Sequence, residues 1–558
     1  MNGNFLFLME HFPALEKTGS LAESYLYADP NACIYKIGTL AETIVNYMFE
    51  LIPIKPSASD NTQFNRLNTL QKLYKSNPDL LQFPNEICDM FHAIRIRRND
   101  AVHAGYDSFE DCLTLLEMAH TISTWFMQAF GDYTYDPIPF VMPEDIRNQP
   151  DYAEIIRENE KLAAELEKAQ AAILEKLAHR HTRAEERKRH ADRAARNIRL
   201  SEREIRYLID EQLRKTGWEA DAINLRYSRG TRPEENRNIA IAEWPTDLAL
   251  CKWGYADYAL FAGLKLVGVV EVNAGRHDIS AAIDNECREY SMAVKEEHEG
   301  YLAGTWGEYK VPFLFAANGR AHIQQNENKS GIWFRDARND ANEARVLQGW
   351  MAPQGLLDML ETDIAAANQR LAASPYDPLL DKKKLSFRPY QIEAVKKTEA
   401  AVIHGRRAAL IVMAAGAGKT RVALGLIFRF LKTGRFKRIL YLVGDKAAGG
   451  RMLGFINKYI GRKAGVCVST VQSLAERVIY GDSDTKPSVT DFDLVILDDA
   501  LDLSKGANIS DYRAAIDYFD AIKIALASAP APYVREIYRT PVFNYSYNRA
   551  VKEGYLIN

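Results

Sequence analysis

The spacing of apolar positions along the 558-residue chain predicts four successive regions of different architecture. In residues 1–135 apolar side chains recur at helical spacing, most clearly in Ile34–Ile54 and Cys112–Ala129. This period is typical of amphipathic helices, so we expect an all-α amino-terminal domain.

A linker region, residues 136–200, is expected to follow this domain. A Pro-rich stretch opens it, and a segment rich in Ala, Glu, Lys and Arg continues it, which predicts a long charged helix with coiled-coil packing as an option. The end of the segment, Arg180–Arg199, is strongly basic. Two interpretations stay open for this basic face: a solvated surface, or a surface that contacts phosphates.

The pattern becomes mixed from residue 201 onward. We expect an amphipathic helix at Glu202–Lys215, two strands at Tyr255–Phe261 and Leu266–Val272, and a helix at Ile279–Tyr290. Residues 201–375 are therefore predicted to form an α/β domain.

Residues 376–558 alternate apolar strands with helices, which predicts a second α/β domain built on a parallel sheet. The expected strands are Ala408–Met413, Arg438–Val443, Gly465–Val468, Leu494–Leu497 and Ile522–Ala527.

Composition excludes a few classes of protein. The net charge of -3 means that a nucleic-acid surface has to be a local basic patch. Six cysteines are scattered without a C-x-x-C pair, which argues against a zinc site or a disulfide framework. No apolar run approaches a membrane span, and the short apolar stretch Phe5–Met9 follows no basic segment, so we expect a cytoplasmic protein.

A glycine-rich loop is the strongest chemical signal in the chain. Gly416, Gly418, Lys419 and Thr420 lie between an expected strand and a helix expected at Arg421–Leu431. Backbone N–H groups at the start of a helix bind phosphate, Lys419 would reach the terminal phosphates, and Thr420 would hold Mg²⁺. The loop therefore predicts binding of ATP or another nucleotide.

Two acids, Asp498 and Asp499, follow the expected strand Leu494–Leu497. Carboxylates at the carboxyl edge of a parallel sheet lie where Mg²⁺ and the attacking water would sit. A surface acidic turn is the alternative interpretation.

These elements resemble the first RecA-like lobe of a superfamily 2 helicase. Arg388-Pro-Tyr-Gln391 is similar to its adenine-reading motif, and Ser469-Thr-Val-Gln472 is similar to a motif that contacts the nucleic-acid strand. The resemblance implies that Arg388 and Gln391 bind the nucleotide, that Thr420 and Asp498 hold the metal, and that Asp499 serves hydrolysis.

The mixed domain resembles a PD-(D/E)xK nuclease core, on the strings Ala256-Asp257 and Val269-Val-Glu271-Val-Asn273. Carboxylates on adjacent strands can share Mg²⁺, so the resemblance implies a metal site at Asp257 and Glu271, with Asn273 and Glu286 at further catalytic positions.

In the order helical domain, linker, nuclease core and motor lobe, the chain resembles the amino-terminal half of a type I restriction enzyme R subunit. The strings Asn224–Glu234 and Ile241–Pro245 are similar to its nuclease domain. The resemblance implies ATP-dependent translocation and cleavage of double-stranded DNA, with ATP and Mg²⁺ as cofactors and modification and specificity subunits as partners. We expect the second motor lobe to be absent here, so this chain by itself should not translocate.

Several catalytic positions depart from the family pattern. Asn273 stands where the nuclease has Lys, Glu286 where it has Gln, Asp499 where the helicase has Glu, and Leu501 where it has His. Ala527-Ser-Ala-Pro530 replaces Thr-Ala-Thr-Pro, which removes two hydroxyls. Lys265 and Arg276 are candidates to replace the missing lysine. A catalytically inactive homologue that binds DNA or partner subunits is therefore the alternative function.

The amino-terminal domain carries a third possibility. Arg98-Asn99-x-x-x-His103 lies in a region that resembles the DUF4145/HEPN-like helical domain, and it matches the R-x4-H motif of HEPN ribonucleases. Positions five apart on a helix face different directions, so Arg98 and His103 would need a bent helix or a dimer partner to converge. The alternative is that both residues hold a helix–helix interface.

Overall fold

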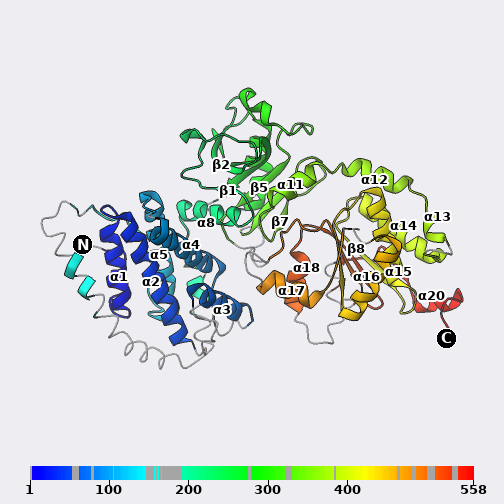
Figure 1. Cartoon of the computed structure of the whole chain (residues 1–558), viewed down its shortest axis with the longest axis horizontal. Coiled ribbons are helices and arrows are strands. Elements are labelled where there is room, and N and C mark those ends of the chain that lie inside the picture. The colour runs from blue at the N-terminus through cyan, green and yellow to red at the C-terminus, as the bar shows by residue number, and fades with distance from the viewer. Residues whose placement is uncertain are drawn as a thin grey trace. The chain divides into compact units, whose positions relative to one another are not determined.

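The computed structural model describes residues 3–52, 62–76, 81–104, 106–145, 197–273, 278–320, 330–381, 385–461, 465–480, 486–498, 509–530 and 538–557, with isolated residues between 147 and 195 and at 534. The chain is multidomain, with an amino-terminal helical region and two α/β sheets, and it divides into two compact units (Figure 1). One unit is Met1–Arg214 with Glu219–Arg345, and the other is Lys215–Trp218 with Val346–Asn558.

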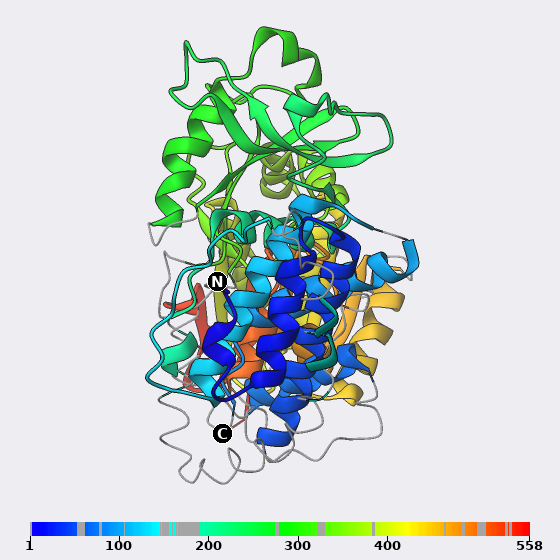
Figure 2. The ribbon, with the colours of Figure 1, turned by 90° about the vertical axis from the view of Figure 1, so that its left-hand side faces the viewer.

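Among its described residues, the amino-terminal region contains the helices α1 (Pro13–Tyr25), α2 (Pro30–Leu51), α3 (Gln63–Ser76), α4 (Asn85–Ala104) and α5 (Phe109–Phe130), preceded by a short 3-10 turn, η1 (Leu6–Leu8). Figure 2 shows α1 and α2 lying side by side. Asp29 caps α2 by accepting a hydrogen bond from the Ala32 N–H, and fully buried rings such as Phe12 and Phe126 fill the core. The helices predicted at Ile34–Ile54 and Cys112–Ala129 are confirmed.

The helix α8 (Glu202–Arg214) has two buried faces within the first unit. Tyr207 and Leu208 join the core of the helical region, whereas Asp210 accepts a hydrogen bond from the hydroxyl of Tyr258 in the first sheet, at 2.9 Å. The helix predicted at Glu202–Lys215 is thus confirmed, and it connects two layers.

The first sheet has the order β1-β2-β3-β4-β5-β6-β7 and is mixed. Its strands are β1 (Glu219–Ala220), β2 (Asn238–Pro245), β3 (Tyr255–Ala262), β4 (Lys265–Val272), β5 (Phe313–Ala317), β6 (Ile332–Asp336) and β7 (Arg345–Leu347), with 3-10 turns η2 (Tyr227–Arg229) and η4 (Glu296–Tyr301) between them. The two predicted strands are β3 and β4, joined through Gly263 at φ +59°.

The helix predicted at Ile279–Tyr290 is interrupted. The chain forms α9 (Ile279–Ala282), a π-helical turn η3 (Ile283–Cys287) and α10 (Arg288–Met292). The wider turn is accompanied by burial of Ile283 and Cys287 against the sheet, where the Cys287 thiol donates to the Phe315 carbonyl at 3.1 Å.

The second unit is a wholly parallel sheet of order β10-β9-β11-β12-β8-β13, flanked by helices (Figure 1). Its strands are β8 (Ala408–Met413), β9 (Ile439–Val443), β10 (Val466–Thr470), β11 (Leu494–Asp498), β12 (Ile522–Ala527) and β13 (Phe543–Tyr545). The helices are α11 (Pro353–Leu360), α12 (Ile364–Ala373), α13 (Asp377–Leu380), α14 (Pro389–Ile403), α15 (Lys419–Thr433), α16 (Lys446–Tyr459), α17 (Val471–Tyr480), α18 (Ile509–Asp517) and α20 (Tyr547–Lys552). The predicted parallel sheet is confirmed, with β13 as an additional strand.

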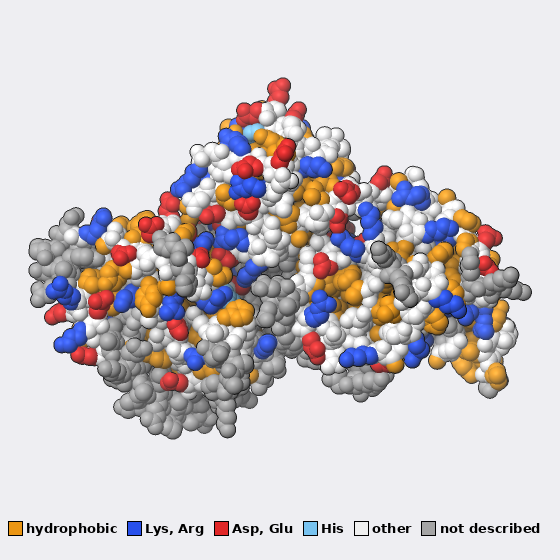
Figure 3. All heavy atoms as spheres, in the orientation of Figure 1, with side chains coloured by type: hydrophobic (Ala, Val, Ile, Leu, Met, Phe, Trp, Pro, Cys, Tyr) orange, Lys and Arg blue, Asp and Glu red, His pale blue; other side chains and the backbone are white. Residues whose placement is uncertain are grey.

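Acidic and basic side chains are interspersed on the face shown in Figure 3, in keeping with the small net charge. Among the described residues, no helix combines the length and the apolar character that crossing a membrane requires.

Candidate functional site

The glycine-rich loop lies at the carboxyl end of β8 and leads into α15. Gly416 and Gly418 adopt φ of +81° and +87°, a region that side-chain-bearing residues rarely occupy. The loop is held from α14, because the Tyr390 hydroxyl and Gln391 Nε2 both donate to the Ala417 carbonyl at 3.0 Å. A side chain at Gly418 would collide with Gln391, so the loop is built tightly against α14.

Three predicted nucleotide-site residues meet at this edge of the sheet. The Thr420 hydroxyl donates to Asp498 Oδ2 at 2.7 Å, and the Tyr441 hydroxyl donates to the same oxygen. Lys419 is buried and donates to the Ser528 hydroxyl at 2.6 Å. Hydroxyl and carboxylate oxygens are the ligands that Mg²⁺ prefers, so Thr420 and Asp498 fit such an ion.

The contact of Ser528 with Lys419 bears on the segment Ala527–Pro530, which departs from the helicase pattern. Ala527 and Ala529 lack the hydroxyls that the family has at these positions, but Ser528, between them, places a hydroxyl on Lys419.

Arg388 lies beside the loop as well: its backbone N–H donates to Gln391 Oε1 at 3.0 Å, and its guanidinium lies over the ring of Tyr555. The predicted Asp499 and Leu501 lie outside the described residues.

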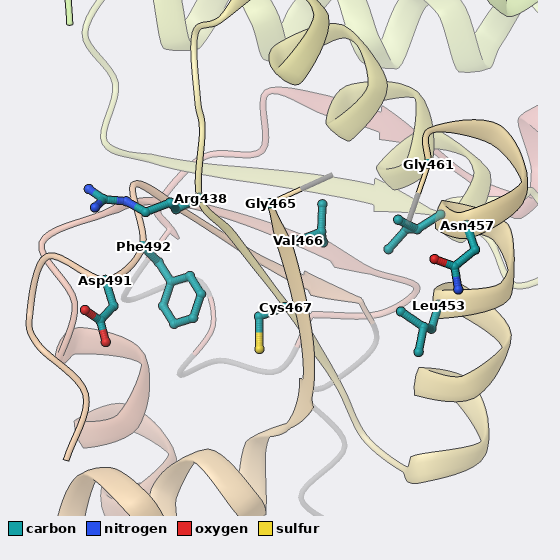
Figure 4. Close-up of a pocket in the computed structure, with 10 residues that line it drawn as sticks. Arg438, Leu453, Asn457, Gly461, Gly465, Val466, Cys467, Asp491 and Phe492 are labelled. Atoms are coloured by element: carbon teal, nitrogen blue, oxygen red, sulfur yellow. The ribbon is translucent and has the colours of Figure 1, made fainter. Parts of the chain in front are cut away.

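A pocket of about 350 Å³ lies elsewhere on the second sheet (Figure 4). Residues that precede β9, β10 and β11 line it, among them Arg438, Gly465 and Phe492. It is therefore at the amino ends of the strands, opposite the glycine-rich loop, and it contains none of the predicted site residues.

The predicted carboxylates of the first sheet lie side by side. In the β3–β4 ladder Tyr258 pairs with Val270, so the next rung places Asp257 opposite Glu271. Asp257 is nearly buried, and its Oδ2 accepts the Val272 N–H at 2.7 Å. Burial, and next the charge of Asp257, raise the pKa of Glu271 to about 8, with a smaller contribution from Glu286. A divalent cation fits this pair, because it would relieve the repulsion of two carboxylates.

Tyr290, four residues after the predicted site residue Glu286, also reaches this site. Its hydroxyl donates to Glu271 Oε2 at 2.7 Å, and Glu286 is partly buried in the π-helical turn one turn earlier. Among the described residues, no cluster of three or more His, Cys, Asp or Glu side chains could hold a metal. Backbone and water oxygens would therefore have to complete the ligand set of Asp257 and Glu271.

The position of the missing lysine carries no charge. Asn273 follows β4, its N–H donates to the Ala317 carbonyl at 2.9 Å, and its side chain is partly exposed. Lys265 is six residues before Glu271 on the same strand, which at about 3.3 Å per residue is roughly 20 Å away. The prediction that Lys265 replaces the missing lysine is therefore wrong. Arg276, the other candidate, lies outside the described residues.

A cation that the sequence patterns did not reveal does reach Asp257. Arg206 in α8 donates from Nη2 to Asp257 Oδ1 at 2.5 Å, and its side chain is 15% exposed. It lies 51 positions before Asp257 in the chain, in a helix where an arginine is an ordinary surface residue, so no local signal distinguishes it.

The candidate ribonuclease residue Arg98 is engaged between two helices. It donates to Glu42 Oε2 at 2.6 Å, lies over the ring of Tyr35, and packs its methylenes where Gly38 leaves room. These contacts favour the helix–helix interface for Arg98. The side chain of His103 lies outside the described residues, so the ribonuclease site stays a prediction.

Two parts of the chain match restriction-enzyme families. Residues 219–360 match the family described as "Type I restriction enzyme EcoKI endonuclease subunit second domain", and residues 384–465 match "Type III restriction enzyme, res subunit". The first match covers the sheet with Asp257 and Glu271, and the second covers the glycine-rich loop. Both matched families are thus families of restriction enzymes.

The chain is homologous to type I restriction enzyme endonuclease subunits. It is 31% identical over 645 residues to the EcoKI endonuclease subunit of Escherichia coli (strain K12), an alignment that covers 96% of this chain and 54% of that protein. It is 27% identical over 325 residues to the EcoAI endonuclease subunit of Escherichia coli, covering 54% of this chain and 36% of that protein. The resemblance to an R subunit is confirmed, and the chain spans about half the length of the EcoKI subunit.

One solved structure, described as a fragment of an HsdR subunit of a type I restriction enzyme from Vibrio vulnificus YJ016, aligns with 64% of this chain and 62% of its own. The identity is 17% and the TM-score 0.24, which is too low to bear on the fold.

Proposed function

We propose that this chain is the nuclease and nucleotide-binding part of a type I restriction enzyme R subunit, acting on double-stranded DNA with Mg²⁺ and ATP. In this proposal the first sheet is a PD-(D/E)xK nuclease-like core and the second sheet is a RecA-like lobe. The proposed domains are 1–135, 136–200, 201–375 and 376–558. Modification and specificity subunits are the proposed partners, since the relatives are named as subunits of such enzymes.

The juxtaposition of Asp257 and Glu271 carries the nuclease proposal. The two carboxylates sit on adjacent antiparallel strands, and Tyr290 orients Glu271 through its hydroxyl. A bound divalent cation supplies charge that stabilises the transition state of phosphodiester cleavage and lowers the pKa of a bound water. Asp257 and Glu271 would hold such an ion, and the hydrogen bonds from the Val272 N–H and the Tyr290 hydroxyl orient the two carboxylates.

The nucleotide proposal is supported by the loop between β8 and α15. Gly416 and Gly418 leave the backbone free to approach phosphates, and Lys419 is proposed to exchange its contact with Ser528 for the terminal phosphates. Thr420 and Asp498 would hold Mg²⁺, and Arg388 and Gln391 are proposed to bind the base.

Nicking and linearisation of supercoiled DNA with Mg²⁺ or Mn²⁺ tests the nuclease proposal. We expect cleavage by the unaltered chain and its loss in Glu271→Ala. Glu296→Ala, which removes an exposed carboxylate from the same domain, is the matched control and should cleave normally. Cleavage that persists in Glu271→Ala would contradict the proposal.

A catalytically inactive homologue that binds DNA or partner subunits is the second candidate. The neutral Asn273 favours it, because an amide cannot balance the charge of a phosphate. No cleavage by the unaltered chain, together with cleavage by Asn273→Lys, would establish this second function.

A further inference from the structure

Arg206 belongs to a helix outside the first sheet, yet its guanidinium contacts Asp257, one of the two carboxylates. Nη2 donates to Asp257 Oδ1 at 2.5 Å, and Nη2 also lies 3.0 Å from Glu202 Oε1 one turn earlier on α8. An arginine stays charged at every physiological pH. A permanent positive charge is therefore built into the site beside Asp257.

The other terminal nitrogen of this guanidinium, Nη1, is buried and lacks an acceptor among the described residues. A buried donor without an acceptor destabilises the folded protein, so Nη1 calls for an acceptor that the described residues do not supply. The planar fork of arginine matches the oxygens of a phosphate.

Side chains next to Arg206 fix α8 on both sides. Tyr207, the next residue, accepts a hydrogen bond from Arg97 Nε at 2.8 Å in the helical region, and Asp210 is bonded to Tyr258 in the sheet. The helix is thus fixed against both layers, and it holds the Arg206 guanidinium beside Asp257.

We propose that Arg206 contacts the scissile phosphate and supplies the positive charge that Asn273 lacks. This inference rests on the proposed nuclease function for its substrate, a phosphodiester of double-stranded DNA. In hydrolysis a water oxygen forms a bond to phosphorus while the bond to the leaving deoxyribose oxygen breaks. The water loses one proton, the leaving oxygen gains one, and extra negative charge gathers on the non-bridging oxygens, where Nη1 donates.

The test compares four forms of the full chain: unaltered, Arg206→Met, Arg206→Lys and, as a matched control, Arg203→Met. Arg203 is on the same helix with its side chain 51% exposed. Binding of a short DNA duplex in the presence of Ca²⁺ is measured at several salt concentrations. Loss of one phosphate contact lowers the slope of log K against log salt by about 0.9, which we expect for Arg206→Met only.

Cleavage of supercoiled DNA gives the second readout. We expect Arg206→Met to lower the rate by about a hundredfold or more, as removal of one transition-state donor does. Arg206→Lys should keep most of the salt slope, and Asn273→Lys in the Arg206→Met background should restore cleavage by returning a cation to the site. If Arg206→Met does not fold, Arg206→Gln gives the same comparison, because it keeps a donor without the charge.

The outcomes separate this inference from the proposed function. An unchanged salt slope in a folded Arg206→Met overturns the inference, whatever Glu271→Ala does to cleavage. Faster cleavage by Arg206→Met also overturns it, since Arg206 would then only neutralise Asp257. A lowered slope in a chain that never cleaves supports the phosphate contact and overturns the nuclease function.

Discussion

The buried ion pair between Arg429 and Glu399 offers a sharp test of how the nucleotide lobe is held together. Arg429 lies in α15, which begins at Lys419, and Glu399 lies in α14, which carries Gln391. Their side chains are 2% and 3% exposed, with Nε to Oε1 at 2.5 Å and Nη2 to Oε2 at 3.1 Å. The pair therefore links the two helices that build the nucleotide loop.

We expect Arg429→Met to lower the free energy of unfolding by about 3–5 kcal/mol. The substitution removes the cation beside the buried Glu399 carboxylate, which keeps its hydrogen bond from the Tyr376 hydroxyl. A buried charge that has lost its ion-pair partner destabilises a fold by about 3–5 kcal/mol. It also removes donors from the carbonyls of Leu371 and Pro375, which Arg429 binds at 3.2 and 2.9 Å.

The assay is urea denaturation of the full chain, followed for the transition that reports the second unit. Arg429→Met with Glu399→Leu should cost less than Arg429→Met alone, because no charge is then left buried. Lys397→Ala is the control: Lys397 is paired with Glu393 at 3.0 Å, but its side chain is 52% exposed, so the cost should stay below about 1 kcal/mol. A cost of Arg429→Met below about 1 kcal/mol, or a double variant that costs the sum of the single ones, would refute the reasoning.

Three further predictions concern single side chains. Burial raises the pKa of Glu23 from 4.5 to about 7, so the stability that its protonated form contributes is present below about pH 4.5 and is lost as the pH rises through 7. Glu23→Gln should remove this loss: between pH 5 and pH 8 its free energy of unfolding should rise by about 3 kcal/mol relative to that of the unaltered chain, as measured by unfolding at each pH. Gly418→Ala should abolish binding of a fluorescent ATP analogue, because the residue has φ +87° and its Cβ would collide with Gln391. Ser528→Ala should tighten ATP binding about fivefold, measured by calorimetry, because Lys419 then has no hydrogen bond to Ser528 to break before it binds the phosphates.

Each of these three has an outcome that contradicts it. A Glu23→Gln variant whose stability follows the same pH profile as the unaltered chain would show that another group titrates. Unchanged nucleotide affinity in Gly418→Ala would mean that the loop adapts to a side chain. Weaker ATP binding in Ser528→Ala would assign the hydroxyl to the nucleotide rather than to Lys419.

The sequence predicted five strands of the second sheet closely, but only β3 and β4 of the first sheet. Buried strands such as Ala408–Met413 are short, nearly continuous apolar runs bounded by turn residues, and that signal is local. The helix at Ile279–Tyr290 was less well predicted, because its π-helical turn depends on how Ile283 and Cys287 pack on the sheet rather than on periodicity. β13 escaped prediction because a strand of three residues is too short to show a period.

The candidate sites divide in the same way. Motif residues such as Lys419, Asp257 and Glu271 could be found from the sequence, because each lies in a fixed register to a strand or a loop. The pairings of Lys419 with Ser528 and of Arg206 with Asp257 join positions 109 and 51 residues apart. Spacing along a chain says nothing about such pairs; the order of the strands and the docking of α8 decide them. The sequence by itself thus determined which chemical groups this homologue of restriction-enzyme subunits carries, and only the tertiary structure decided which cation contacts Asp257.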